Sequence, residues 1–437
     1  MSAATATRQL LEQEARALLT RLDRVQPFAL HETMVPAAAP SPAALDAIER
    51  ALITGRQSLR HRVLGYLAWI RGAGRTLSPA EQQRHFVVIR LAFNDVLSQF
   101  DLFTEVITQR SEHETGVWLS GLDVLAADAI DLGQPFYQAP PLVCYLARGP
   151  GAAIRRARTR LPGGVPNPVA IVRVPRERMI GSGIASSLVH ECGHQGAALL
   201  RLVESLRPEL VAAERAADPD TAKAWRCWQR WVSEVVADFW SVARLGIAST
   251  LGLLAVVSLP RFFVFRPSGD DPHPIPYIRV HLSAAIGQAL YPHPQWLELA
   301  RAWAAMYPLS DVRDDHQRRI ARLLASLPAF LSLLVNHRPP ALQGATLGQA
   351  LASPDRRPEQ LLAAFERFRV HPAEMVAASP TLVFGAIGQA RAMQRTTPEQ
   401  ETQVLARLLR QWALRSTLDI TTICAGARTP ISANRTT

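Results

Sequence analysis

Apolar residues recur at helical spacing toward both ends of the chain. Residues 7–26 carry apolar positions three and four apart, Ser41-Pro42 is typical of a helix start, and Ser78-Pro79-Ala80-Glu81 is a capping box. Toward the C-terminus the same spacing predicts helices over four ranges: 294–306, 311–336, 358–368 and 398–415. We therefore expect long helical regions on both sides of the middle of the chain.

The middle of the chain mixes strand and helix patterns. Short apolar runs at 141–147 and 169–174 predict two strands, and the arginine-rich segment between them predicts a solvated loop. A helix then begins near Gly181 and is expected to stop at Pro208, because proline breaks the helical hydrogen bonding. Residues 208–221 predict a loop with a short helical turn, and residues 224–244 return to the helical period.

These elements predict an α+β fold that is mostly α-helical, with a small sheet in its central part. We divide it into a helical region (1–135), a mixed core (136–300), a helical region (301–427) and a flexible tail (428–437). The longest apolar run, Leu245 to Leu259, is short for a bilayer and is followed by Pro260. It predicts a buried helix, and no membrane span is expected.

Composition narrows the class of protein. The chain has 437 residues, 48% of them hydrophobic, which is enough for one to three globular domains. The formal net charge is +11, but Lys223 is the only lysine and the arginines are spread along the chain. With the richness in Ala, Leu and Pro, this pattern indicates a GC-rich bacterial gene more than a nucleic-acid partner.

The cysteines and the N-terminus bear on the cellular compartment. The four cysteines are far apart and form no C-x-x-C pair, so neither a disulfide framework nor a thiolate zinc site is indicated. The first residues lead into an amphipathic segment that lacks the apolar core of a signal peptide. We expect a cytoplasmic protein.

The chemistry is concentrated in an H-E-x-x-H motif, His190-Glu191-Cys192-Gly193-His194. On a helix the two histidines lie one turn apart on one face and can bind one metal ion, with Glu191 beside the metal-bound water. Zinc lowers the pKa of that water to about 7, and the carboxylate accepts its proton as it attacks a carbonyl. Cys192 lies about 200° around the helix from His190 and is expected to be a buried apolar residue.

A zinc site of this kind needs a third protein ligand, which the helix at 224–244 can supply. Glu234 and Asp238 lie one turn apart there, so Glu234 can bind the metal while Asp238 accepts the free ring N–H of a ligand histidine. Three other glutamates compete less well, since one is about 15 Å along the first helix and two lie in the predicted loop: Glu204, Glu209 and Glu214. Three residues without ligand-spaced partners are assigned packing or surface roles: His85, His113 and Glu114.

H-E-x-x-H followed by E-x-x-x-D on a second helix resembles the gluzincin superfamily of zinc metallopeptidases, the thermolysin-like and prenyl-protease-like group. A metzincin would need glycine and histidine where this chain has Ala197 and Leu200. The resemblance covers about residues 165–280, and the separation of His194 from Glu234 is longer than in thermolysin itself.

The segment Asp271-Pro-His273-Pro-Ile-Pro-Tyr277-Ile-Arg279 resembles the His-Pro and downstream Arg element of prenyl-protease-like gluzincins. By that resemblance His273 or Arg279 would stabilise the oxyanion of the tetrahedral intermediate, and Tyr277 is a weaker candidate. The resemblance thus implies a gluzincin-like core of small sheet and two motif helices. From the residues alone, the segment is a proline-rich loop.

We predict a zinc-dependent hydrolase of peptide or amide bonds, with Glu191 as general base and a peptide or protein as substrate. Two alternatives stay open. An H-E-x-x-H site can hold Fe²⁺ and oxidise a peptide with 2-oxoglutarate, in which case Arg279 would bind the cosubstrate carboxylate. The motif can also be structural, in a non-catalytic helical interaction protein. Oligomeric state and substrate sequence are not predicted.

Overall fold

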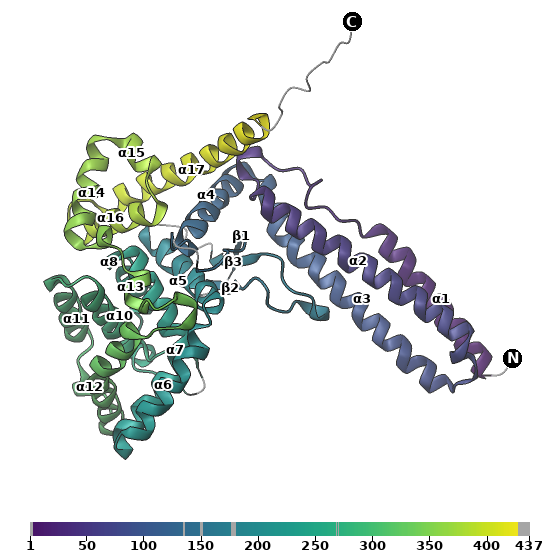
Figure 1. Ribbon diagram of the computed structural model, residues 1–437, viewed down its shortest axis with the longest axis horizontal. Helices are drawn as coiled ribbons and strands as arrows, with labels where there is room; N and C mark the ends of the chain where they lie inside the picture. The colour runs from purple at the N-terminus through teal and green to yellow at the C-terminus, as the bar shows by residue number, and fades with distance from the viewer. Residues whose placement is uncertain are drawn as a thin grey trace, which may run out of the picture. The chain divides into compact units, whose positions relative to one another are not determined.

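The computed structural model describes residues 3–133, 136–148, 152–175, 181–267, 269 and 271–426 (Figure 1). Helices make up 76% of the structure, and three short strands form one sheet. The prediction of an α+β fold that is mostly helical is therefore confirmed. The predicted tail, 428–437, lies outside the described residues.

The contacts divide the chain into two compact units, which differ from the three regions that we predicted. The first contains residues 1–117, 140–145 and 155–171, and the second contains 118–139, 146–154 and 172–437. The predicted boundaries near 135 and 300 both lie within the second unit, because helices from both sides enter one core. Trp240 donates to the carbonyl of Ala129, and the helix that begins at Asp314 packs on the helix that carries Glu234.

The first unit is built on three helices that pack side by side: α1 (Ala3–Arg24), α2 (Pro42–Arg71) and α3 (Pro79–Thr108) (Figure 1). Both predicted starts are confirmed, since Ser41 caps α2 and Ser78 with Glu81 forms the capping box of α3. Their apolar faces share one core, which includes Leu18, Ile48 and Phe103.

Strands β1 (Leu142–Ala147), β2 (Ala153–Arg155) and β3 (Ala170–Pro175) form a sheet in the order β1-β3-β2. β1 and β3 are the predicted strands. β2 was missed because three residues are too few to show a period of two, and its arginine end reads as loop. β2 lies at one edge of the sheet.

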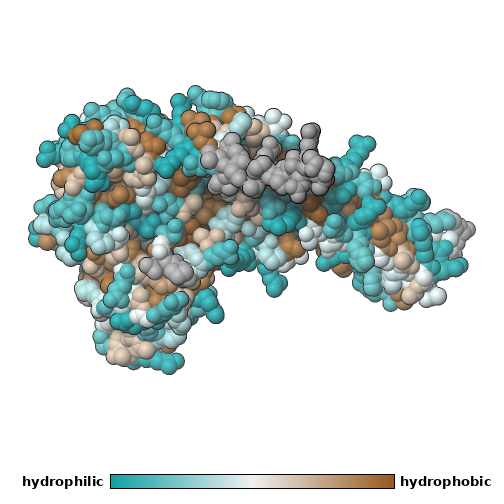
Figure 2. All heavy atoms as spheres, turned by 45° about the horizontal axis from the view of Figure 1, so that its top comes forward, coloured by the Kyte–Doolittle hydropathy of each residue, from teal (hydrophilic) through white to brown (hydrophobic). Residues whose placement is uncertain are grey.

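The second unit holds the remaining helices. They are α4 (His113–Ile130, which begins in the first unit), α5 (Ser182–Leu199), α6 (Leu202–Ala216), α7 (Pro219–Leu245), α8 (Ile247–Val257), α9 (Arg261–Val264), α10 (Pro276–Leu290), α11 (Pro294–Met306), α12 (Asp314–Asn336), α13 (Leu347–Leu351), α14 (Pro358–Val370), α15 (Pro372–Ala377), α16 (Pro380–Ala392) and α17 (Pro398–Gly426). On the face shown in Figure 2, hydrophobic residues are interspersed among hydrophilic ones.

Helix α7 is the centre of the second unit. Of its 27 residues 16 are buried, including nearly all from Glu234 onward. It contacts α5, α6, α10, α12 and α16. Asp218 caps its start through the amides of Asp220 and Thr221, and Gly246, with a φ of 58°, ends it. Because its second half is enclosed on all sides, polar side chains there must find partners inside the protein.

The prediction that Pro208 ends the motif helix is wrong. The helix ends at Leu199, and Arg201, in the left-handed conformation with a φ of 53°, turns the chain into α6. Pro208 lies inside α6, where it removes one hydrogen bond, to the carbonyl of Glu204. The predicted loop from 208 to 221 is therefore mostly helix, and Glu204 is on a different helix from His194.

The apolar run 245–259 forms the end of α7 and the short, mainly buried α8. Among the described residues, α12 is long and apolar enough to cross a membrane, but the core helix of a globular protein meets the same criteria. α12 packs on α7 and α10. Other helices missed from the sequence include α10 and α16, which contain few polar residues to mark a face.

Helices α5 and α7 approach closely because α5 has glycines on the shared face. A Cβ atom at Gly193 would lie 2.9 Å from the Cβ of Trp240, and one at Gly196 would lie 2.3 Å from the ring of Trp240. Real Cβ atoms do not come this close, so any larger residue must separate the helices.

We predict that Gly196→Ala lowers the free energy of unfolding by about 1–3 kcal/mol, because overpacking forces the backbone or Trp240 to shift. Urea unfolding followed by tryptophan fluorescence measures this. Gly183→Ala on the same helix is the matched control, since a Cβ there meets nothing within 4 Å. Equal stability of the two variants would contradict the close packing of α5 on α7.

Candidate metal centre

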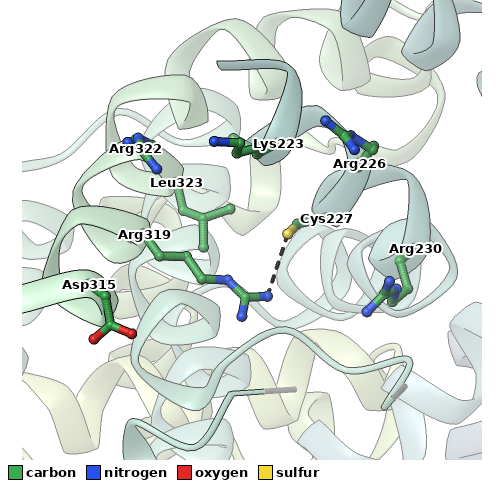
Figure 3. A pocket seen from close by; sticks show the side chains of 9 residues that line it. Lys223, Arg226, Cys227, Arg230, Asp315, Arg319, Arg322 and Leu323 are labelled. Atoms are coloured by element: carbon green, nitrogen blue, oxygen red, sulfur yellow. Dashed lines mark hydrogen bonds between the residues drawn. The ribbon is translucent and has the colours of Figure 1, made fainter. Parts of the chain in front are cut away.

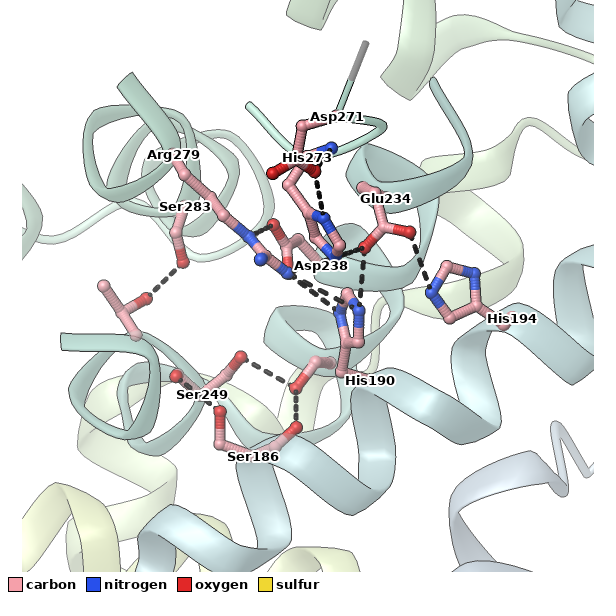
Figure 4. Close-up of polar contacts among 12 residues, drawn as sticks. Ser186, His190, His194, Glu234, Asp238, Ser249, Asp271, His273, Arg279 and Ser283 are labelled. Atoms are coloured by element: carbon pink, nitrogen blue, oxygen red, sulfur yellow. Dashed lines mark hydrogen bonds and ion pairs between the residues drawn. The ribbon is translucent and has the colours of Figure 1, made fainter. Parts of the chain in front are cut away.

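The predicted ligands come together between α5 and α7. Ligand atoms of His190, His194 and Glu234 all lie within 4.8 Å of one another. Nε2 of His190 is 3.3 Å from Oε2 of Glu234, and Nε2 of His194 is 3.4 Å from Oε1 of the same carboxylate (Figure 4). The carboxylate thus faces the Nε2 atoms of two imidazoles that are one turn apart on α5.

The competing glutamates are engaged elsewhere or exposed. Glu209 contacts His337, Glu214 pairs with Arg226, and Glu204 is exposed on α6. None of the three joins the histidine pair. His85 stacks on Trp69, in agreement with a packing role.

The environment of Glu234 fits a cation. Its side chain is only 10% exposed, and Oε2 is buried without a hydrogen bond of normal geometry to any described residue. Burial by itself would raise the pKa of Glu234, but the hydrogen bonds and charges of His190 and His194 outweigh burial and hold the pKa well below its usual range. Two imidazole nitrogens and one carboxylate are donors that both zinc and ferrous iron accept.

Asp238 lies one turn after Glu234 and contacts the other nitrogen of His190. Its Oδ1 is 2.9 Å from Nδ1 of His190, an arrangement that directs Nε2 toward Glu234. Burial lowers the pKa of His190, yet the charges and hydrogen bonds of Asp238 and Glu234 dominate and raise this pKa to about 9. The contact has the form expected for a carboxylate that orients a metal-binding histidine.

Arg279 supports Asp238 from α10. Its Nε donates to Oδ2 of Asp238 at 2.7 Å, and its Nη2 donates to Oδ1 at 2.8 Å (Figure 4). Burial would raise the pKa of Asp238, but the charges of Arg279 and His190 lower it to about 2. This bidentate pair keeps Asp238 ionised inside the protein.

The two residues assigned to oxyanion stabilisation by resemblance are placed differently. Nε and Nη2 of Arg279 both donate to the carboxylate of Asp238. This pairing does not support a role for Arg279 in binding 2-oxoglutarate. His273 is half exposed, with Nδ1 2.6 Å from Oδ1 of Asp271 and Nε2 3.2 Å from Oε2 of Glu234. Of the two side chains, His273 is the more exposed to solvent.

Tyr277 is not brought into the site. Its side chain is buried on α10, with its ring 5.0 Å from that of Phe265 and 4.8 Å from that of His281. The predicted proline-rich loop holds for residues 271–275 and fails from Pro276, which is the first residue of α10, a position at which proline favours a helix.

A cavity of about 160 Å³ reaches His190 of the histidine pair. Glu191, Asp238, His273 and Arg279 line it, together with small and apolar side chains from α8 and from Ala152 beside β2. The Glu191 carboxylate is half-buried and makes no hydrogen bond or ion pair with another described side chain. A carboxylate so placed is available to exchange a proton with a molecule in the cavity.

Three buried serines on the cavity wall were missed from the sequence. Ser186 donates to the carbonyl of Ser249, Ser249 donates to the hydroxyl of Ser241, and Ser241 donates to the carbonyl of Ser186 (Figure 4). Helical spacing gave one indication of these serines. Ser186 lies one turn before His190 and Ser241 lies three residues after Asp238, so each is expected beside a residue of the site. The ring joins α5, α7 and α8 behind the site.

No family model matches this chain, and no curated protein and no solved structure is similar to it.

We predict one metal ion per chain in the protein as purified or reconstituted. His194→Ala should lose this metal, because only two of the three protein ligands would remain. Elemental analysis after gel filtration gives the stoichiometry. His371→Ala, which changes an exposed histidine of the same unit, should retain the full equivalent. Undiminished metal in His194→Ala would show that the ion is held elsewhere.

We also predict that Asp238→Asn weakens metal affinity by about 10-fold to 100-fold without abolishing binding, since the residue orients a ligand and is not itself one. Competition with a chromogenic chelator measures the affinity. A change below twofold would contradict the orienting role, whereas complete loss of metal would make Asp238 a ligand.

Proposed function

We propose that this protein is a metal-dependent hydrolase of peptide or amide bonds that uses a zinc ion held by His190, His194 and Glu234. One observation carries the proposal: the chain brings two imidazole nitrogens and a buried, hydrogen-bond-deficient carboxylate together, with a further carboxylate, Glu191, on the wall of the adjoining cavity. Three protein ligands are typical of catalytic zinc, because they leave a position for water.

A zinc ion bound by these residues supplies Lewis acidity and lowers the pKa of a coordinated water to about 7. Glu191 accepts a proton at its carboxylate from the attacking water and returns it to the leaving nitrogen. A positioned base of this kind contributes a rate factor of about 10² to 10⁴.

His273 is the residue that we assign to the developing oxyanion. It lines the cavity, and its contact with Asp271 fixes the ring so that Nε2 faces Glu234. A donor fixed in advance stabilises a developing charge without reorganisation during the reaction. Arg279 acts on the reaction indirectly, by holding Asp238 and, through it, the imidazole of His190.

The cavity favours an extended, narrow substrate. Its volume of about 160 Å³ is below the range of about 300–1,000 Å³ that is usual for sites enclosing a whole small molecule. Ala152 lines the cavity immediately before β2, an edge strand. An edge strand can pair with an extended backbone, so we propose a peptide or protein segment as substrate and a small side chain next to the bond that is cut.

The test of this function is Glu191→Gln in the zinc-loaded protein. Hydrolysis of a fluorogenic peptide mixture should fall by about 10²-fold to 10⁴-fold, because the amide cannot accept the proton, while fold and zinc content stay unchanged. Glu204→Gln, an exposed glutamate on α6, should keep full activity. Undiminished hydrolysis by Glu191→Gln with zinc in place would overturn the proposed mechanism.

A measurement on the unmodified protein separates zinc from iron. We expect elemental analysis to find zinc, and peptide hydrolysis to proceed without 2-oxoglutarate or oxygen. Iron content together with 2-oxoglutarate turnover would instead favour the oxygenase alternative.

A further inference from the structure

A cavity of about 420 Å³ lies away from the candidate metal centre, between the first half of α7 and the start of α12 (Figure 3). We call it the basic groove. Five of its nine lining residues are cationic: Lys223, Arg226, Arg230, Arg319 and Arg322. With 48 Lys and Arg in 437 residues, an average set of nine residues would contain one.

The positive charge of the basic groove is only partly neutralised by the protein. Lys223 and Arg322 share the carboxylate of Asp220, at 2.9 and 3.1 Å, and Arg226 pairs with Glu214 at 3.2 Å. Asp315, the acidic residue on the wall, is paired with Arg313. Two carboxylates outside the groove therefore serve three of its cations.

The other two cations have no carboxylate partner among the described residues. Arg319 extends across the groove, where Nη2 contacts the thiol of Cys227 at 3.7 Å (Figure 3), and it is half-buried. Arg230 donates to the backbone carbonyl of Gly269. A guanidinium in a hollow with only a sulfur or a carbonyl as neighbour has donors left for an anion.

The remaining lining is apolar. Ala224 and Leu323 are buried, and Cys227 is half-buried. The volume of the basic groove is in the usual range for small-molecule sites, and these three residues offer apolar surface beside its cations. Arginine binds phosphate with two parallel hydrogen bonds, which fits a phosphate ester better than a single carboxylate.

We propose that the basic groove binds a small organic phosphate, whose phosphate group lies between Arg319 and Arg230 and whose apolar part rests on Ala224, Cys227 and Leu323. This site is separate from the metal centre and does not depend on the hydrolase function. It uses the first half of α7, whereas Glu234 and Asp238 belong to the second half.

The test uses the full-length protein and phenyl phosphate as probe. Cys227 serves as a reporter inside the groove: its alkylation by neutral iodoacetamide is followed by mass spectrometry of the peptide that contains it. Phenyl phosphate should protect Cys227 in a saturable manner at constant ionic strength, and inorganic phosphate should protect it more weakly, since it lacks the apolar part.

Variants decide whether the protection comes from the proposed contacts. In Arg319→Gln the phenyl phosphate concentration for half-protection should rise at least tenfold, because a charged hydrogen-bond donor is lost. Arg318→Gln is the matched control: it removes the same charge from the adjacent, exposed position of α12, outside the groove lining, and should leave that concentration within twofold. Arg230→Gln, on a different helix, is a second test should Arg319→Gln fail to fold.

Three results would overturn the proposal. Absence of protection by millimolar phenyl phosphate would show that the groove takes no organic phosphate. If Arg318→Gln weakened the protection of Cys227 as much as Arg319→Gln does, the protection would come from the net charge of the protein and not from contacts in the groove. Protection by an oligonucleotide at much lower concentration than by phenyl phosphate would identify a nucleic acid as the partner instead.

Discussion

The candidate metal centre depends on burying charged groups in such a way that each one has a partner. An isolated ion inside a protein is costly, so each must be paired and hydrogen-bonded. Here Arg279 pairs with Asp238, Asp238 contacts His190, and His190 faces Glu234. Removing a member leaves its neighbour with an uncompensated charge. This chain of contacts explains why two carboxylates on one buried helix are tolerated in the middle of the second unit.

Helix α7 makes that arrangement possible because almost every side chain of its second half is enclosed. α5 supplies the histidines, α10 supplies Arg279, and α8 closes the cavity with Ser249 and Leu253. The glycines of α5 allow its histidines to reach the carboxylate on α7. The same contacts therefore pack these helices together and position the side chains of the site, which have little freedom to rearrange.

The sequence predicts the parts of this protein that follow from local periodicity. The candidate ligands His190, His194 and Glu234 could be named together with Asp238, because helical spacing puts them on defined faces. The pairing of Arg279 with Asp238 could not, since it joins residues 41 apart through tertiary packing. The prediction that Pro208 ends a helix is wrong because proline is uncommon inside helices but not excluded from them. Strand β2 was missed because it is too short to show a period of two residues. The division into the two compact units could not be predicted, because it depends on contacts between distant segments.

Gly193 lies inside the H-E-x-x-H motif, and the lack of a side chain there lets α5 approach Ala237 and Trp240 of α7. Motif searches treat that position as free. A homologue with serine or alanine there would pass such a search, although its α5 would be displaced from α7 and its histidines from the third ligand. Sequence surveys for relatives of this protein should therefore weigh the small residues at 193 and 196 together with a large aromatic residue at 240, because those three positions set the spacing on which the metal-binding residues depend.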